Sequence, residues 1–421
     1  MYRAVIVAAA AMAAGMSQAY AGAGYVPYLT TYADIAHAGY EDALIAARLL
    51  DDKVDALIAE PTAPNLEAAR DAWLAARVPY QQTEVYRFGN AIVDDWEGRV
   101  NAWPLDEGLI DYVDPAYGVV SDENEFYAAN LIANPVLKVA GREIDASTID
   151  KALLADTLHE LGDVEANVAT GYHAIEFLLW GQDLNGTGPG AGNRPVTDFD
   201  PANCTGGNCD RRVAYLTAAT DLLIDDLEEM VGNWAEGGAA RDALMKGDAK
   251  AGLSAILTGL GSLSYGELAG ERIRLGLMLH DPEEEHDCFS DNTHNSHFYN
   301  IVGMRNVYTG SYQRIDGSTV SGPSLADLVA RQASEINAEM LAKLDASLDA
   351  AKAMVVRAET KEAYDQMIGD GNAEGNAVVQ RVVDSLVDQT RSIERVVAAL
   401  KLGAIEFEGS DSLDNPSAVF Q

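Results

Sequence analysis

The stretch Gly171-Tyr172-His173-Ala174-Ile175-Glu176-Phe177-Leu178-Leu179-Trp180-Gly181 is the most informative part of this chain. Apolar residues recur along it at three- and four-residue steps, which predicts the C-terminal half of an amphipathic helix that begins near Asp156. His173 and Glu176 are three residues apart and therefore share one face of that helix. They lie at the edge of the apolar stripe, where a polar pair is costly unless something satisfies it.

The pair has two interpretations. An imidazole and a carboxylate one helical turn apart can point at a single cation, as inward-facing Glu-x-x-His pairs do in metal-binding helical bundles. Alternatively, the histidine is paired with its neighbour inside a packed interface. Four residues alone do not separate the two.

The rest of the chain also follows helical periodicity, apart from a few segments rich in Gly, Pro and Asn. Pro79 lies within one predicted helix and indicates a kink there. Asp106 is a plausible N-cap for a short helix that follows it. The pattern predicts helices over 31–60, 66–93, 107–113, 123–133, 212–234, 264–279, 324–356 and 376–402.

Two stretches in the second half resemble stretches in the first. Glu271-Arg272-Ile273-Arg274 repeats the Glu-x-x-Arg of Glu84-Val85-Tyr86-Arg87, and Cys288-Phe289-Ser290-Asp291 falls where Trp103-Pro104-Leu105-Asp106 fell. This weak repeat predicts an all-α fold of two tandem, four-helix-bundle-like domains with a site near their junction.

On this repeat Glu84 and Glu271 occupy equivalent places. They are candidates to join His173 and Glu176 if both bundles face one cleft. The alternative is that each glutamate pairs with an arginine across its own bundle.

The predicted organisation follows from changes in composition along the chain. The segment 185–208 is rich in Gly, Pro and Asn and shows no apolar periodicity, which predicts a connection between domains or a long functional loop. The segments are a signal peptide at 1–21, a first bundle at 22–183, the connection at 184–209, a second bundle at 210–408 and a tail at 409–421.

The first residues have the pattern of a targeting segment. Arg3 precedes a short apolar run, and Ala19-Tyr20-Ala21 is a small-x-small cleavage site. The run is too short to span a membrane, and no cysteine nearby could carry a lipoprotein anchor. We expect cleavage after Ala21, a periplasmic or secreted protein and no membrane span in the mature chain.

Charge and cysteine content fit this compartment. The chain carries 66 acidic and 29 basic residues, a formal net charge of −37, which argues against nucleic acid or an anionic membrane as a partner. The charge favours cations, or serves only for solubility. Cys204 and Cys209 enclose a turn-like spacer and predict a small disulfide loop, while Cys288 is expected to be a buried thiol.

Three stretches of this chain resemble the imelysin family. The family signature Gly-x-His-x-x-Glu reads Gly171-Tyr172-His173-Ala174-Ile175-Glu176, and the branch called iron-regulated proteins is similar at Trp103-Pro104-Leu105-Asp106-Glu107 and at Cys288-Phe289-Ser290-Asp291-Asn292-Thr293-His294. The likeness runs from about residue 32 to residue 403. It implies two all-helical bundles with the signature near their junction.

The resemblance also implies an exported protein that handles a metal, with iron favoured and zinc possible on ligand type. His173 and Glu176 would be ligands, with Glu84 and Glu271 as further carboxylates. Supporting residues would be Arg87, Arg274, Asp106 and Asp291. A membrane component of iron uptake is a possible partner.

Two other functions stay open. The family is named after an insulin-cleaving protein and classed among peptidases, but a metallopeptidase needs three ligands, an activated water and a general base. Only two ligands are evident, so binding is favoured over catalysis. In the third interpretation the chain is a structural or interaction module in which the pair is only a buried salt bridge.

Two other motifs are weaker indications of a metal site. The histidine-rich stretch 286–297 could bind zinc or copper, but it lacks a second cysteine at a finger-like spacing and is interpreted mainly as an ordered loop. His159-Glu160-Leu161-Gly162-Asp163 lacks the second histidine of a zinc-protease helix.

Overall fold

The computed structural model describes residues 24–122, 124–139 and 141–420, so the expected signal peptide lies outside the described residues. Helices make up most of the regular structure, which confirms the all-α fold class. Two short antiparallel hairpins are the β-structure of the described chain, β1 (Val136–Val139) with β2 (Arg142–Asp145) and β3 (Ser311–Gln313) with β4 (Thr319–Ser321). The α-helices are α2 (Val26–Ala59), α3 (Ala63–Gln81), α4 (Ala91–Asn101), α5 (Lys151–Leu153), α6 (Gly171–Trp180), α7 (Cys209–Trp234), α8 (Ala239–Met245), α9 (Ala249–Ser262), α10 (Gly276–Leu279), α11 (Thr293–Thr309), α12 (Leu325–Gln332), α13 (Ser334–Thr360), α14 (Tyr364–Ile368), α15 (Ala373–Leu400) and α16 (Asp411–Asp414).

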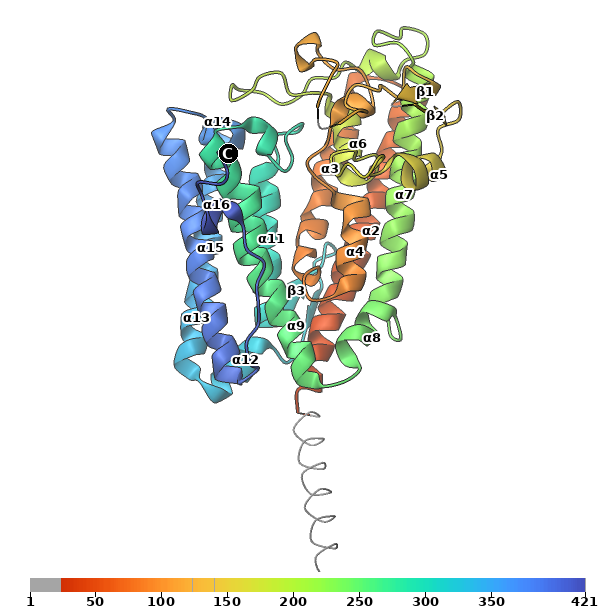
Figure 1. The fold of residues 1–421 in the computed structure, drawn as a ribbon. Coiled ribbons are helices and arrows are strands. Elements are labelled where there is room, and N and C mark those ends of the chain that lie inside the picture. The colour runs from red at the N-terminus through yellow and green to blue at the C-terminus, as the bar shows by residue number, and fades with distance from the viewer. Residues whose placement is uncertain (1–23, 123, 140, 421) are drawn as a thin grey trace, which may run out of the picture.

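The helices stand in two groups side by side (Figure 1). In one group α2 packs against α3 and α7, and the short α6 packs against α3, α4 and α7. In the other, α13 and α15 pack against each other and α11 packs against α13. Helices α3 and α11 contact each other and join the two groups.

The segment 184–209 does not separate the two groups of helices. Helix α7 follows this segment in sequence but packs against α2 and α6, which precede it. The buried apolar residues form one continuous cluster across both groups. The two groups of helices therefore do not follow the boundary expected at residues 184–209. A division of the chain into two domains stays a prediction.

The helix that carries the signature is shorter than the periodicity predicts. The expected start near Asp156 is wrong, because residues 154–158 form a single π-helical turn, residues 159–170 form turns, and α6 begins at Gly171. Leu161 and Val168 are buried as expected, but burial in turns produces the same apolar spacing as burial on a helix.

Other predicted helices also differ from the structure. Residues 124–133 form turns because the backbone N–H groups of Asn130, Leu131 and Ile132 bond to the carbonyls of residues 108–110. The helix expected over 66–93 ends at Gln81, two residues after Pro79, and the one expected over 324–356 is broken between α12 and α13. Much of the one expected over 264–279 is π-helical.

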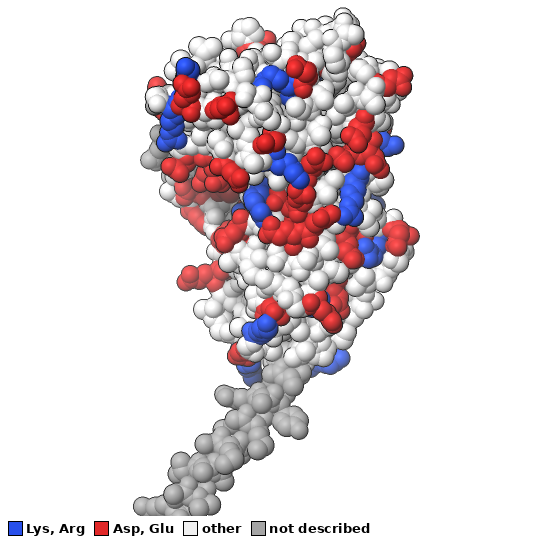
Figure 2. Space-filling model, turned by 90° about the vertical axis from the view of Figure 1, so that its right-hand side faces the viewer, with Lys and Arg blue, Asp and Glu red and all other residues white. Residues whose placement is uncertain are grey.

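The surface is strongly acidic. Figure 2 shows one face on which carboxylates are spread widely and basic side chains lie among them. This matches the excess of 66 acidic over 29 basic residues in the whole chain. Among the described residues, no helix is both long enough and apolar enough to cross a membrane.

Candidate metal centre

Helix α6 begins at Gly171 because only glycine fits there. Its φ is +75°, and a Cβ would lie 2.3 Å from the carbonyl oxygen of Val100. The preceding Thr170 is extended and donates its hydroxyl to the carbonyl of Arg99 at 2.7 Å. Gly181, with φ +71°, ends the helix. The two glycines therefore delimit a helix of 10 residues, all of them buried.

His173 and Glu176 contact each other on α6. His173 Nδ1 lies 3.1 Å from Glu176 Oε2, and the two side chains are 2% and 0% exposed. Ser290 donates its backbone N–H and its hydroxyl to Glu176 Oε1 at 3.0 and 2.7 Å. His173 Nε2 is buried and has no hydrogen-bond partner among the described residues. When Nδ1 carries the proton and donates to Glu176, Nε2 offers its lone pair to a cation.

A second histidine and a carboxylate come from the loop that precedes α11. The ring centroids of His173 and His286 are 4.7 Å apart, with the planes nearly perpendicular at 83°. One ligand atom each from His173, His286 and Asp287 lie within 4.8 Å of one another, and all three residues are buried. Within the described part of the chain, these are the His, Cys and acidic side chains close enough to share one metal ion.

Hydrogen bonds hold Asp287 in place from several elements. Arg77 on α3 donates to Oδ1 at 2.8 Å, and its guanidinium also lies 3.2 Å from His286 Nδ1. Oδ2 accepts from Asn292 at 2.9 Å and from the hydroxyl of Ser296. Arg77 neutralises the charge of Asp287, so a metal ion must share this carboxylate with Arg77 or displace it.

Burial sets the protonation states of the group. It lowers the pKa of His173 to about 3, assisted by the positive charge of Arg77, and it lowers the pKa of His286 well below its ordinary value. Burial, together with the charge of Asp287, raises the pKa of Glu176 well above its usual range. Burial opposes ionisation of Asp287, but Arg77 and His286 outweigh it and hold the pKa of Asp287 well below its ordinary value. Both imidazoles are therefore neutral at pH 7, the form that binds metals.

The donor set fits a borderline divalent metal such as iron or zinc. Two imidazoles and one carboxylate are the ligand types of many iron and zinc sites. The buried, unpaired Nε2 of His173 is the structural feature that such an ion would satisfy.

The sequence matches the imelysin family, Peptidase_M75, over residues 36–393. The chain belongs to the imelysin family. It is also 39% identical over 71 residues to iron-regulated protein A of Synechococcus elongatus, a match that covers 17% of this chain and 20% of that protein. The matched region thus spans about a fifth of the relative's length.

Solved structures share the fold of this imelysin-family chain. A protein from Parabacteroides distasonis, described as an iron-regulated protein A precursor, has a TM-score of 0.64 at 18% identity and is covered over 95% of its length by 90% of this chain. An imelysin-like protein from Psychrobacter arcticum has a TM-score of 0.60 at 18% identity, with 90% of this chain and 96% of that one covered. At this identity the likeness is one of fold alone.

The structure does not bring Glu84 or Glu271 to the pair on α6. Glu84 is buried and accepts a hydrogen bond from Arg272 at 2.7 Å, so it pairs with an arginine of the other repeat. Glu271 is exposed and lines a hollow beside residues 409–419. Neither joins the group of three possible ligands in the described chain.

The two predicted supporting arginines have other partners. Arg87 donates to Asp94 at 2.7 Å and to Glu267 at 3.2 Å. Arg274 donates to the side chain of Gln380 on α15. The hydrogen bonds of Arg87 and Arg274 in the described chain thus go to residues other than Glu84 and Glu271, and their expected role in orienting those carboxylates stays a prediction.

The two predicted supporting aspartates lie in loops. Asp106 Oδ2 accepts from Asn124 at 2.5 Å, and Asp106 does not cap the short 3-10 turn Glu107–Leu109 with its side chain. Asp291 has a φ of +56°. Burial and the charges of Asp365 and Asp183 raise its pKa to about 7.

The cysteines are arranged as follows. Cys204 and Cys209 form a disulfide bond, and Cys288 is a free thiol that is partly exposed rather than fully buried as expected. Burial, followed by the charge of Glu176 and of other nearby carboxylates, raises the pKa of Cys288 well above its ordinary value. Cys288 therefore lies close to the metal centre without belonging to its three possible ligands.

Sequence reasoning missed the roles of His286, Asp287 and Arg77. The first two begin the histidine-rich stretch 286–297, whose capacity to bind metal was the available signal, but that stretch was interpreted mainly as an ordered loop. Arg77 gave no signal, because an arginine on an amphipathic helix is usually solvated.

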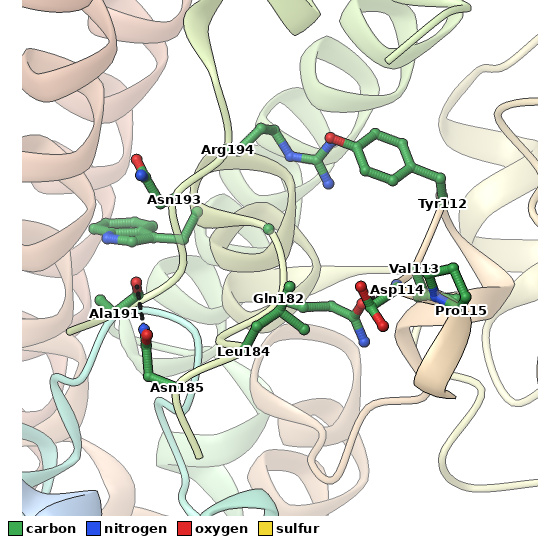
Figure 3. A pocket seen from close by; sticks show the side chains of 12 residues that line it. Tyr112, Val113, Asp114, Pro115, Gln182, Leu184, Asn185, Ala191, Asn193 and Arg194 are labelled. Carbon is green, nitrogen blue, oxygen red and sulfur yellow. Dashed lines mark hydrogen bonds between the residues drawn. The ribbon is translucent and has the colours of Figure 1, made fainter. Parts of the chain in front are cut away.

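A separate pocket of about 390 Å³ lies at the C-terminal end of α6. Figure 3 shows Arg194 and Tyr112 directed toward each other on one side, with Gln182 between Asp114 and Leu184. Arg194 is compensated by Asp111 at 2.7 Å, among other partners. None of the three possible metal ligands lines this pocket.

Proposed function

We propose that this chain is an exported metal-binding protein whose bound ion is held by His173, His286 and Asp287, with iron favoured over zinc. The observation that carries the proposal is the buried Nε2 of His173, which has no hydrogen-bond partner and lies beside a second imidazole and an ionised carboxylate. Glu176 is the residue that orients His173, because its carboxylate faces Nδ1 and is fixed by Ser290. A carboxylate behind a metal-binding histidine fixes the tautomer and makes the imidazole a better ligand.

This ligand set differs from the one expected from the sequence. His173 is a ligand in both sets. Glu176 orients His173 instead of binding the metal, and His286 and Asp287 are the further ligands instead of Glu84 and Glu271. A set of two histidines and one carboxylate suits ferrous iron, and also zinc. The names of the similar proteins from Synechococcus elongatus and Parabacteroides distasonis refer to regulation by iron and favour iron.

The setting of this function is outside the cytoplasm. The predicted signal peptide at 1–21 and the disulfide between Cys204 and Cys209 support an oxidising compartment. The acidic surface suits attraction of cations and excludes nucleic acid as a partner. A membrane component of iron uptake is the kind of partner that such a protein would supply.

Metal content and affinity test the proposal. The mature chain from Gly22 onward is compared with His173→Ala and Asp287→Asn variants, and His37→Ala is the matched control because His37 lies partly exposed on α2. We expect stoichiometric binding of Fe²⁺ under anaerobic conditions, lost in the first two variants and kept in the control. If the wild type binds neither Fe²⁺ nor Zn²⁺ while all variants are folded by circular dichroism, the proposal is wrong.

A metallopeptidase is the second candidate, because the family is classed among peptidases. All three possible ligands and Glu176 are buried, whereas peptide cleavage needs an open metal position and a substrate cleft. Cleavage of unfolded peptides by the metal-loaded protein, abolished in His173→Ala, would favour this alternative. A protein that is stable, binds no metal and cleaves no peptide is instead a structural module with a buried His-Glu pair.

A further inference from the structure

A narrow acidic recess is lined in part by the loop that carries His286 and Asp287. The recess is lined by four carboxylates and one thiol, contributed by three segments of the chain: Glu107, Asp183, Glu283, Glu285 and Cys288. Its volume of about 10 Å³ is room for about one water-sized occupant. A peptide or a lysine side chain is therefore too large, whereas a single ion is not.

One of these carboxylates is buried without a partner. Glu285 is 1% exposed, and neither of its oxygens has a hydrogen-bond partner in the described chain. An unpaired carboxylate at such a depth is expensive unless a cation or a proton compensates it. Glu285 therefore adds an unpaired, buried carboxylate to the lining of the recess, beside three other carboxylates.

The same loop lines the recess and builds the metal centre. Glu285 and Cys288 line the recess, whereas His286 and Asp287 between them belong to the possible ligands. Ser290, two residues further on, holds Glu176 by two hydrogen bonds. Neighbouring residues of one short loop thus line the recess and build the metal centre.

We propose that the recess is a second, outer binding station for a divalent cation, from which the ion passes to the buried centre of His173, His286 and Asp287. This inference rests on the proposed function. The buried centre needs an entry path, and carboxylate oxygens are ligands that suit divalent cations such as Mn²⁺. Clefts lined by one sign of charge raise the local concentration of the opposite ion and its association rate by about 10- to 1,000-fold.

Mn²⁺ is the probe, because its binding is followed by electron paramagnetic resonance and by stopped-flow mixing. The test variants are Glu283→Gln and Glu285→Gln, which keep shape and remove one charge each. Glu284→Gln is the matched control, since Glu284 lines a different hollow. We expect two Mn²⁺ per wild-type chain, the weaker one lost in both test variants and kept in the control. Entry of the tighter ion should be at least about tenfold slower in the test variants.

The outcomes separate this inference from the proposed function. If one tight Mn²⁺ binds and its stoichiometry and association rate are the same in Glu285→Gln and Glu283→Gln, the recess plays no part and only this inference is overturned. If His173→Ala keeps the weaker ion and loses the tighter one, the outer station is established. If the wild type binds only a weak ion that Glu285→Gln removes, the recess binds cations and the proposed centre does not. If no Mn²⁺ binds, both are overturned.

Discussion

Replacement of Glu176 by glutamine would show how the pair on α6 works, because it keeps the shape and changes only which atoms donate and accept. A glutamine that offers its oxygen to Ser290, as Glu176 Oε1 does at 3.0 and 2.7 Å, directs its NH₂ group at His173 Nδ1, which lies 3.1 Å from the other oxygen. A donor at that place forces Nδ1 to accept. The ring proton then moves to Nε2, and the lone pair that would bind a metal is lost.

The opposite orientation of the glutamine side chain also leaves a donor facing a donor. It offers its oxygen to His173 Nδ1 but presents NH₂ to the backbone N–H of Ser290. In either orientation the metal-bound state leaves a buried donor without an acceptor, which costs about 1–3 kcal/mol. We therefore expect Glu176→Gln to weaken metal binding by about 5- to 150-fold, which agrees with the usual effect of residues that orient metal-binding histidines.

Titration calorimetry with Zn²⁺ and anaerobic competition with Fe²⁺ at pH 7 measure this loss. Glu165→Gln is the control, since Glu165 is exposed and lies outside α6. An affinity within twofold of the wild type would show that Glu176 does not set the tautomer of His173. A loss beyond about 10,000-fold would exceed any orienting role and would show that Glu176 binds the metal directly.

Three further perturbations probe the surroundings. Burial lowers the pKa of His297 to about 3, whereas a histidine in the unfolded chain has a pKa near 6.5. The stability that the neutral His297 contributes above pH 6.5 is therefore lost as the pH falls. Between pH 7 and pH 5 the free energy of unfolding, measured with urea, should fall by about 2 kcal/mol more in the wild type than in His297→Gln. Gly171→Ala should lower the free energy of unfolding by about 2–5 kcal/mol because φ is positive and the added methyl group meets backbone, whereas Gly98→Ala, with open space around it, should not. Arg77→Met removes the counter-ion of the buried Asp287, which keeps its hydrogen bonds from Asn292 and Ser296, and should lower the free energy of unfolding by about 3–5 kcal/mol. Zn²⁺ should raise the Tm of this variant more than that of the wild type, and equal shifts would contradict the ligand role of Asp287.

The long helices could be predicted because their apolar stripes are sustained over many turns. The periodicity predicted helices over 31–60 and 376–402, and the structure has α2 at Val26–Ala59 and α15 at Ala373–Leu400. In both, the buried residues recur at helical steps on the side that faces the core. Helices cannot be predicted as well from short apolar patterns, because turns can bury residues at the same spacing. The turns around 159–170 bury Leu161 and Val168 in this way.

The site was predictable only as far as it is local. His173 and Glu176 share a helix turn, so their contact follows from the spacing of three residues. Arg77, His286 and Asp287 lie about a hundred residues away in either direction, and no periodicity links them to α6. The internal repeat predicted Glu84 as a further ligand, but Glu84 accepts a hydrogen bond from Arg272 on the π-helical segment 263–275.

The distribution of unpaired polar atoms argues against a purely structural pair on α6. Buried polar groups in folded proteins nearly always find partners, and the exceptions cluster at functional sites. Within the described chain such atoms occur on several elements, Trp234 and Ser347 among them, and two of the residues that carry them belong to the proposed cation sites: His173 in the metal centre and Glu285 in the recess. A purely structural pair needs only the hydrogen bond between His173 and Glu176. It does not explain why a histidine nitrogen and a carboxylate nearby in the sequence of the metal-binding loop remain without hydrogen-bond partners. A cation at the metal centre accounts for Nε2 of His173, and a cation in the recess accounts for the carboxylate of Glu285.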